Sequence, residues 1–390
     1  MNHDMAKSAY KAGTQNFVLG ITYWLIVALL LTLGFGQLLR FEFFSVPFYL
    51  HDVIVICILL LQGLTCDWRT VLKRNSWLQA KKGSPAGERT VLVGTNWLFF
   101  LALAISSLRA LTLYPLSSLL IPSLYMFRVL AYLIIYFQIK KSEIKIPKIY
   151  FLIAGFTALL IGLTQYILLP DMRIFQYLGW DDHLSRLTLP HFDPTFTGVI
   201  LSLFLLSIPA LPSPLALLTF IAILLTYSRS VWLSLILTFV CFIKNKLILL
   251  FAVSCMLLAI FVLPQKFGEG TNLFRTYSIS SRANSDLAYV QRYAGDVLFG
   301  RGMNTLILDT PSSKYVNHAT GPNNSYLYLL VTTGILGLVG WGMFIFSLYQ
   351  KSVYKPMMIF FLIASLFNNV MFYPFTLLWV LLLHTQKENI

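Results

Sequence analysis

Charged residues are scarce in this chain: Asp, Glu, Lys and Arg make up 11% of its 390 residues, whereas hydrophobic residues make up 57%. Ordinary soluble domains carry about 25% charged residues, so a soluble fold of the usual kind is excluded. Cysteine is scarce too, and the four cysteines show no paired spacing, which argues against a disulfide framework or a zinc site. The solvent for most of this chain is therefore lipid.

Uncharged stretches long enough to cross a bilayer, which takes about 20 helical residues, recur along the sequence. Because lipid offers no hydrogen-bond partners to exposed backbone, such stretches are predicted to be helices. The predicted fold is an all-α polytopic membrane protein, one domain over residues 1–390 with about 12 transmembrane helices. The stretches are residues 17–39, 48–64, 90–108, 111–138, 149–169, 195–208, 214–227, 231–243, 247–263, 326–348 and 357–383, the last of which is long enough to cross twice.

Lysine is distributed asymmetrically around these stretches. Lys7 and Lys11 precede the first stretch, Lys140 and Lys141 follow the fourth, and Lys351 follows the tenth. Because short cytoplasmic loops are rich in Lys and Arg, this pattern predicts that the N-terminus and the C-terminus both lie in the cytoplasm. The same rule explains the net charge of +14 without a nucleic-acid partner.

The predicted outer face contains one large loop, residues 264–322, between spans 9 and 10, and it is rich in arginine rather than lysine. The planar fork of donors on arginine matches phosphate oxygens, so we expect a phosphorylated partner on this face. For any single arginine, ion pairing with a loop carboxylate such as Asp296 or Asp309 is the alternative. The arginines of this face include Arg173, Arg186, Arg229, Arg275, Arg282, Arg292 and Arg301.

Residues 317–327 end the large loop and combine polar side chains with a Gly/Pro turn. His318, Asn323 and Asn324 lie in this turn, and an apolar helix is predicted to begin directly after it. Glycines from Gly334 to Gly340 recur every three residues in that helix, a spacing suited to close helix contact. The pattern predicts a functional site at a membrane surface.

A second polar segment precedes the sixth span. His191 and Asp193 come just before Pro194, and a carboxylate at that position would lie at the positive end of a proline-started helix. The neighbouring residues 181–183, Asp-Asp-His, are interpreted as a solvated loop, because adjacent side chains point in different directions and no partner motif accompanies them. We therefore expect neither a metal nor a cofactor.

A few charged residues fall within the apolar stretches themselves. His51 and Asp52 lie near the outer end of the second span, and Arg128 lies in the fourth. Such groups are costly in hydrocarbon unless they are paired or face a polar cavity. For Arg128 we expect a side chain that extends to the cytoplasmic interface.

Four motifs in the second half of the chain occur in a characteristic order. They are residues 190–195 (P-H-F-D-P-T), residues 227–232 (Y-S-R-S-V-W), Ser281-Arg282 with 298–302 (L-F-G-R-G), and 323–327 (N-N-S-Y-L) leading to 334–338 (G-I-L-G-L). In these motifs, and in its span number and orientation, the chain resembles the O-antigen ligase and O-antigen polymerase superfamily of bacterial surface polysaccharide assembly.

The resemblance implies glycosyl transfer from a polyprenyl pyrophosphate-linked oligosaccharide to a glycan acceptor, on the extracytoplasmic side of the bacterial inner membrane. It implies that Arg229 and Arg282 hold the pyrophosphate, with Arg301 in a looser match. Arg292, in the same loop, is a further candidate for this role. The expected partners are this lipid-linked donor, the acceptor, the bilayer, and a chain-length regulator or flippase.

The chain departs from the ligases at one position. Their signature has a histidine, then an amide or hydroxyl residue, nine positions and Gly-x-x-Gly, and here Asn323 and Asn324 occupy the first two places. Asparagine does not take up a proton at ordinary pH, so the candidates for the base are His318, Asp193 and His191, in that order, and Asn323 and Asn324 are expected to bind substrate.

This departure favours a repeat-unit polymerase, because the resemblance implies motifs that vary more among polymerases than among ligases. No metal is expected, since two or three arginines can stabilise the leaving pyrophosphate in its place. An O-antigen ligase stays open as the alternative. From other classes, a transporter or flippase of the same lipid and a non-enzymatic assembly component also stay open.

Overall fold

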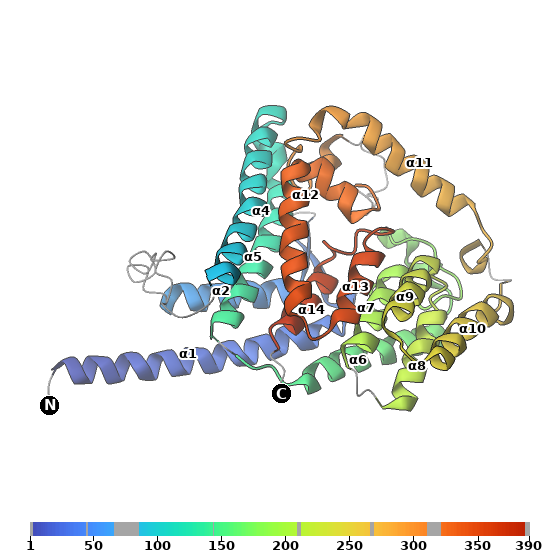
Figure 1. Ribbon diagram of the computed structural model, residues 1–390, viewed down its shortest axis with the longest axis horizontal. Helices are drawn as coiled ribbons and strands as arrows, with labels where there is room; N and C mark the ends of the chain where they lie inside the picture. Colours follow the sequence, from blue (N-terminus) through green and yellow to red (C-terminus); the bar gives the residue numbers. More distant parts are fainter. Residues whose placement is uncertain are drawn as a thin grey trace.

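The computed structural model describes residues 3–43, 46–65, 86–142, 144–208, 212–265, 269–309 and 321–386, and most of these are helical (Figure 1). The α-helices are α1 (His3–Leu33), α2 (Leu50–Thr65), α4 (Ala86–Leu113), α5 (Leu120–Ser142), α6 (Lys148–Leu168), α7 (Pro194–Ser207), α8 (Ser213–Leu224), α9 (Arg229–Phe242), α10 (Lys246–Val262), α11 (Tyr277–Arg292), α12 (Ser325–Lys351), α13 (Lys355–Ala364) and α14 (Pro374–His384). Short 3₁₀ helices are η1 (Gly36–Leu39), η2 (Leu116–Leu119), η3 (Met172–Leu178), η4 (Glu269–Thr271), η5 (Ala294–Asp296) and η6 (Thr305–Asp309).

Three helical segments are long and apolar enough to cross a membrane by length and composition: Leu116–Ser142, Lys148–Leu168 and Ser325–Lys351. Shorter apolar helices, among them α7, α8, α9, α13 and α14, accompany them. The prediction of a helical protein with membrane-spanning segments is confirmed in this coarse form. The number of twelve spans stays a prediction.

The described residues are nearly all helical, and the exception is a β-hairpin at residues 40–49. Strands β1 (Arg40–Phe43) and β2 (Val46–Tyr49) pair antiparallel, with Phe41 opposite Phe48. The rings of these two phenylalanines stack with centroids 6.1 Å apart. Cross-strand aromatic pairs stabilise a hairpin, and four-residue strands are too short to be recognised from alternation alone.

Helices α4, α5 and α12 run side by side on one side of the molecule (Figure 1), and α4 packs closely along α12. Elsewhere α1 packs on α2 and α6, and α13 packs on α7 and α9. Large side chains such as Phe204 of α7, Phe361 of α13 and Trp379 of α14 are fully buried between these helices. The indole Nε1 of Trp379 donates to Ser207 Oγ at 3.1 Å. These contacts fix the position of α7, whose first turn is part of the candidate site.

The glycines of α12 do two different things. A Cβ on Gly340 would lie 2.6 Å from the backbone nitrogen of Phe99 in α4, which confirms the predicted close helix contact there. At Gly334, however, the helix is broken, with φ 71° and ψ −176°. A Cβ at Gly334 would lie 2.3 Å from the carbonyl oxygen of Leu298. This break in α12 makes room for the loop at residues 297–302. The backbone N–H of Arg301 in that loop donates to the Val331 carbonyl at 3.0 Å.

The large loop predicted at residues 264–322 is partly helical in the described portion. It contains η4, α11, η5 and η6, and α11 runs along the outside of the molecule (Figure 1). Apolar side chains of α11, including Ile279 and Leu287, are exposed, whereas Arg282 donates to Asn368 Oδ1 at 2.9 Å. This helix was missed because its polar and apolar residues are too mixed for a transmembrane pattern, although they suit an amphipathic helix.

The charged residues inside the apolar stretches pair with one another. Arg128 forms a salt bridge with Asp52 at 2.9 Å, and both side chains are at most a tenth exposed. Tyr132 Oη donates to Asp52 Oδ1 at 2.6 Å, and His51 Nε2 lies 3.0 Å from the same hydroxyl. The expectation that Arg128 extends to the interface is therefore wrong, and the pair satisfies the requirement for a partner in an apolar surrounding.

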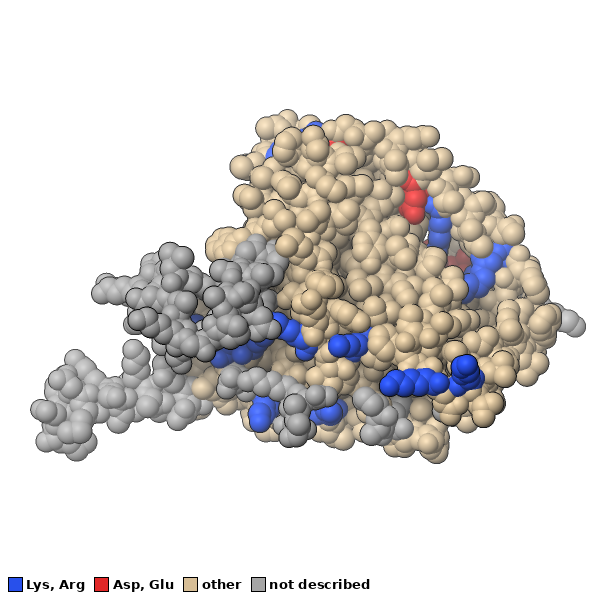
Figure 2. Space-filling view, viewed as in Figure 1, with Lys and Arg blue, Asp and Glu red and all other residues tan. Residues whose placement is uncertain are grey.

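Lysines gather at one set of helix ends. Lys140 and Lys141 lie in the last turn of α5, Lys351 lies in the last turn of α12, and Lys355 and Lys148 begin α13 and α6. Figure 2 shows basic side chains in a row along one edge of the molecule, with a separate group that includes acidic side chains elsewhere. The helix ends that carry lysine are thus separate from the arginine-rich segments, in agreement with the asymmetric distribution of lysine along the sequence.

Candidate functional site

The starts of α7 and α9 meet the break between α13 and α14 in a chain of polar side chains. Ser228 Oγ donates to Thr195 Oγ1 at 3.2 Å and lies 3.3 Å from Ser230 Oγ. Asn368 Nδ2 then donates to Ser230 Oγ at 3.1 Å, and Asn368 Oδ1 accepts from Arg282. Residues of three of the motifs, far apart in the sequence, therefore lie in one hydrogen-bonded group.

The start of α12 joins the same group through its backbone and its cap. Ser325 Oγ donates to the Asn368 carbonyl at 3.0 Å. Asn324 is the N-cap residue, and its Oδ1 accepts from the N–H groups of Tyr326 and Leu327 at 2.8 and 3.2 Å. The expected helix start is confirmed, and the Asn324 oxygen, expected to bind substrate, is used by the cap. The Asn323 N–H donates to Asp286 Oδ1 of α11 at 3.3 Å.

Arg229 and Arg282, the two arginines predicted to hold a pyrophosphate, reach this region from different helices. Arg229 begins α9 and donates to the Leu273 carbonyl at 3.2 Å, to the Arg275 carbonyl, and to Ser278 Oγ at 2.8 Å. Arg282 projects from α11 onto the α13–α14 break, where the Phe367 carbonyl also accepts at 3.4 Å. Both guanidinium groups are thus held by neutral acceptors.

Arg186 is a third arginine of this region, and no pattern in the sequence distinguishes it from Arg173, which lies in the same segment. It is buried, and its Nε donates to the Thr226 carbonyl at 3.1 Å. Burial, followed by the charges of the neighbouring arginines, lowers the pKa of Arg186, although Asp193 opposes this shift. Burial and Arg282 also lower the pKa of Arg229. We call Arg186, Arg229 and Arg282 the open arginine group.

No salt bridge to the open arginine group occurs among the side chains that the structure describes. The charge of Arg282 lowers the pKa of both Arg186 and Arg229. The neutral carbonyl, hydroxyl and amide acceptors only partly offset the positive charge of the three guanidinium groups. Such a group favours the binding of a multiply charged anion.

Arg301 and Arg292 belong to a second region with a different chemistry. Arg301 forms salt bridges with Asp296 at 2.9 Å and with Asp309 at 3.2 Å. Arg109 of α4 binds the other Asp296 oxygen, and Arg292 donates to the Asp309 carbonyl at 2.7 Å. We call these residues the paired arginine group. Burial alone would lower the pKa of Arg301, but the hydrogen bonds to Asp296 and Tyr114 raise it.

The three candidates for the base differ sharply in their surroundings. Asp193 is the N-cap residue of α7, and its Oδ1 accepts from the N–H groups of Thr195 and Phe196 at 2.6 and 2.9 Å, which confirms the expected helix start. His191 is fully buried, with Nδ1 2.9 Å from the Tyr373 hydroxyl. His318 lies outside the described residues. Of the two that are described, only Asp193 is partly exposed, so only Asp193 can be reached by an acceptor sugar.

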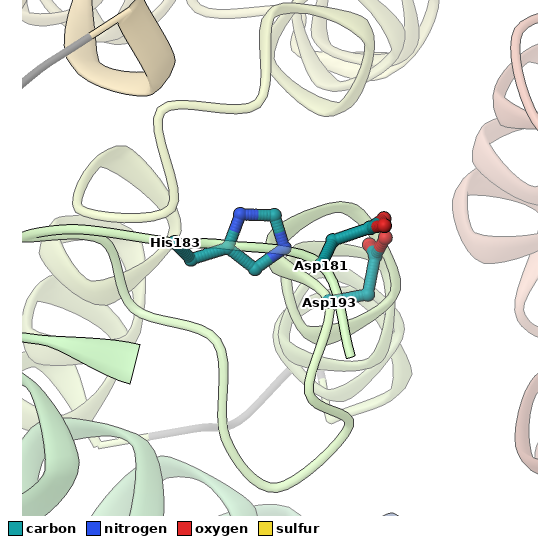
Figure 3. A group of neighbouring side chains, drawn as sticks. All are labelled: Asp181, His183 and Asp193. Atoms are coloured by element: carbon teal, nitrogen blue, oxygen red, sulfur yellow. The ribbon is translucent and has the colours of Figure 1, made fainter. Parts of the chain in front are cut away.

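Asp193 also approaches Asp181 and His183, a grouping that the sequence did not suggest. One potential ligand atom from each of the three lies within 4.8 Å of the other two. Figure 3 shows the His183 ring directed toward the two carboxylates. Residues 181–183 alone are too few for a metal site, whereas the structure adds Asp193 from the start of α7. No regular spacing connects position 193 with this loop.

No model of a known protein family matches the chain, and no curated protein matches it significantly. The chemistry of the site therefore has to be inferred from its residues. The open arginine group, the chain of hydroxyl and amide groups and the Asp193 carboxylate together offer anion binding, hydrogen bonding to sugar hydroxyls and one group able to accept a proton.

Proposed function

We propose that this protein is a membrane glycosyltransferase that uses a polyprenyl pyrophosphate-linked oligosaccharide as its donor and forms a bacterial surface polysaccharide. Its site lies on the extracytoplasmic side of the inner membrane, and both termini are cytoplasmic. The observation that carries the proposal is the open arginine group, which brings Arg229, Arg282 and Arg186 from three parts of the chain to one region without a described carboxylate partner.

The proposed reaction is a substitution at the anomeric carbon of the donor sugar. The acceptor hydroxyl oxygen attacks this carbon, and the bond from the carbon to the pyrophosphate oxygen breaks, with its electron pair leaving on the pyrophosphate. Arg229, Arg282 and Arg186 stabilise the charge that develops there. The hydroxyl proton passes to Asp193 or to His318. The hydroxyl and amide groups from Thr195 to Asn368 orient the sugar.

Two of the arginines that were expected to bind the pyrophosphate have a structural role in this proposal instead. Arg301 and Arg292 already bind Asp296 and Asp309, so they hold the loop against α12 and α4 rather than the pyrophosphate. Arg186 takes their place in the proposed anion site.

A polymerase of repeat units is proposed ahead of an O-antigen ligase, because Asn323 stands where the ligases have their histidine. A flippase is less well supported, because the intramembrane ion pair of Arg128 and Asp52 is satisfied internally and leaves no described charge within the spans for a substrate. Neither alternative changes the expected donor lipid. A chain-length regulator and a flippase are proposed as separate partners in the same membrane.

Deletion of the gene, followed by electrophoretic sizing of the surface glycan and of the polyprenyl-linked glycan, tests this proposal. A polymerase predicts loss of the long ladder, with single repeat units left on the acceptor. Long chains stranded on the polyprenyl carrier, with a bare acceptor, would indicate the ligase. Repeat units trapped on the cytoplasmic side would indicate the flippase, and an unchanged pair of glycan pools would contradict glycosyl transfer altogether.

A further inference from the structure

Beside the open arginine group, we infer a binding site for one divalent metal ion, formed by Asp181, His183 and Asp193. Two carboxylates and an imidazole lie with ligand atoms within 4.8 Å of one another. Ligands bound at about 2.0–2.2 Å to one ion are up to about 4.4 Å apart. Three ligands of one ion have to lie closer together than two opposite ligands, at about 3–4 Å from one another, so the side chains have to close by about 1 Å to bind.

Each of the three side chains is held by a separate structural feature. Asp193 is fixed as the cap of α7, which uses its Oδ1, and no described residue donates to its Oδ2. The backbone of His183 is held where its carbonyl accepts from the Met172 N–H at 2.8 Å. Next to it, Asp171 and Leu184 form an isolated antiparallel β-bridge. The ligands thus come from three anchored points rather than from one mobile loop.

Asp181 is brought to Asp193 by the aromatic residues that directly precede both of them. Trp180 stacks on Phe192 with ring centroids 4.6 Å apart and an interplanar angle of 17°. Because Asp181 and Asp193 each follow one partner of this stacked pair, the stack holds the two carboxylates on neighbouring backbone segments. Two like charges at this separation repel each other, and a bound cation removes that repulsion.

The side chain of His183 is a second, independent indication of a metal site. Its Nε2 is buried and has no hydrogen-bond partner among the described residues, and the ring is directed toward the carboxylates (Figure 3). Imidazole nitrogen is a common metal ligand, so this nitrogen is placed to bind an ion together with the two carboxylates.

The ligand set indicates which ions fit. One imidazole nitrogen with two carboxylates suits Mn²⁺ or Zn²⁺ better than Ca²⁺, which prefers oxygen ligands alone. Three protein ligands leave coordination positions open. Arg186 follows His183 by three residues, and Thr195, two residues after Asp193, accepts from Ser228 in the chain of polar side chains beside the arginines. An anion bound by the arginines can therefore also reach the ion. The binding of the ion stands by itself, and only this role toward a pyrophosphate rests on the proposed function.

A Mn²⁺ binding experiment tests the inference. The full chain is purified in detergent, its purification tag is removed, and the electron paramagnetic resonance signal of free Mn²⁺ is followed. We expect one saturable Mn²⁺ per chain. Asp193→Asn should weaken this binding by at least about tenfold, since even second-shell changes weaken metal sites by that factor. Asparagine is as good an N-cap as aspartate, so α7 should stay intact. Asp181→Asn should have a similar effect.

Asp182→Asn is the matched control, because Asp182 is the exposed neighbour of Asp181 and is not part of the group. It should leave Mn²⁺ binding unchanged. The inference is overturned if the chain binds no saturable Mn²⁺, or if Asp182→Asn weakens binding as much as Asp193→Asn. Because the measurement involves no glycan, normal Mn²⁺ binding together with unchanged glycan pools in the deletion strain would contradict the proposed function alone.

Discussion

The two arginine groups show how the same side chain takes opposite roles within one protein. In the paired group, Arg301 and Arg109 share the carboxylate of Asp296, so their charge is neutralised inside the protein. In the open group, the partners of Arg229 and Arg282 among the described residues are carbonyl, hydroxyl and amide groups. The first arrangement holds a loop in place, and the second leaves positive charge available to a ligand.

The largest expected effect is on glycan polymerisation, and it distinguishes the open arginine group from the paired one. Arg229→Ala or Arg282→Ala should each reduce glycan polymerisation by about 100-fold or more, because each removes a charged donor from the leaving group. Arg229→Lys should restore little, since lysine lacks the planar fork. The ladder of surface glycan, compared at equal protein level in the membrane, is the readout. Arg173→Ala is the control, because Arg173 is exposed and pairs with Asp171, and it should leave the ladder unchanged.

The next largest expected effect is on the stability of the protein, and it distinguishes the paired arginine group from the open one. Arg301→Met should destabilise the protein by about 1–3 kcal/mol, because it removes a charged hydrogen-bond donor from Asp296 and a salt-bridge partner from Asp309. Thermal unfolding in detergent, followed by intrinsic fluorescence, measures this. Asp296→Asn should act in the same direction. A variant of Arg301 with unaltered melting temperature and a lost ladder would instead place Arg301 among the ligand-binding arginines.

The break in α12 offers a further test of how the paired group is held. Gly334→Ala should destabilise the protein by about 1–3 kcal/mol, since its backbone conformation is nearly restricted to glycine and the added Cβ would meet the Leu298 carbonyl. Gly342→Ala, on the same helix with open space around the added Cβ, should be close to neutral. Equal melting temperatures for the two variants would mean that the 297–302 loop does not depend on this break.

The smallest effect is a pH dependence next to the open group. Burial raises the pKa of Asp286, although the Asn323 N–H and Arg282 oppose the shift. A carboxyl whose folded pKa is raised costs stability once it ionises, so this contribution is lost as pH rises from about 4, the unfolded value, through the folded value. Asp286→Asn should therefore flatten the decline of melting temperature above pH 4. A steeper decline would contradict the direction of the shift.

Several features of the fold and the site could be predicted from the sequence because they depend on local rules. Pro194 after Asp193 predicted a helix start with a capping carboxylate, and the apolar run after Asn324 predicted α12. Composition predicted a helical membrane protein. Each of these depends on neighbouring residues or on an average over many of them.

The remaining features depend on contacts between distant segments. Arg186 and Arg173 look alike in sequence, and only the packing of residue 186 against the Thr226 carbonyl distinguishes them. The approach of Asp193 to His183 depends on the stacking of Trp180 on Phe192. The partners of Arg301, likewise, are decided by how the 297–302 loop enters the break in α12. A sequence pattern carries no information about such pairings unless they recur at a fixed spacing.

The central claim is that the open arginine group, and not the paired one, binds the pyrophosphate of a lipid-linked donor. Its most direct test is the binding of a photoreactive polyprenyl pyrophosphate oligosaccharide to the purified protein, with Arg282→Ala compared with Arg301→Ala at equal folded concentration. The account predicts that labelling falls by at least about tenfold in Arg282→Ala and is retained in Arg301→Ala. Retained labelling in Arg282→Ala together with lost labelling in Arg301→Ala would contradict it.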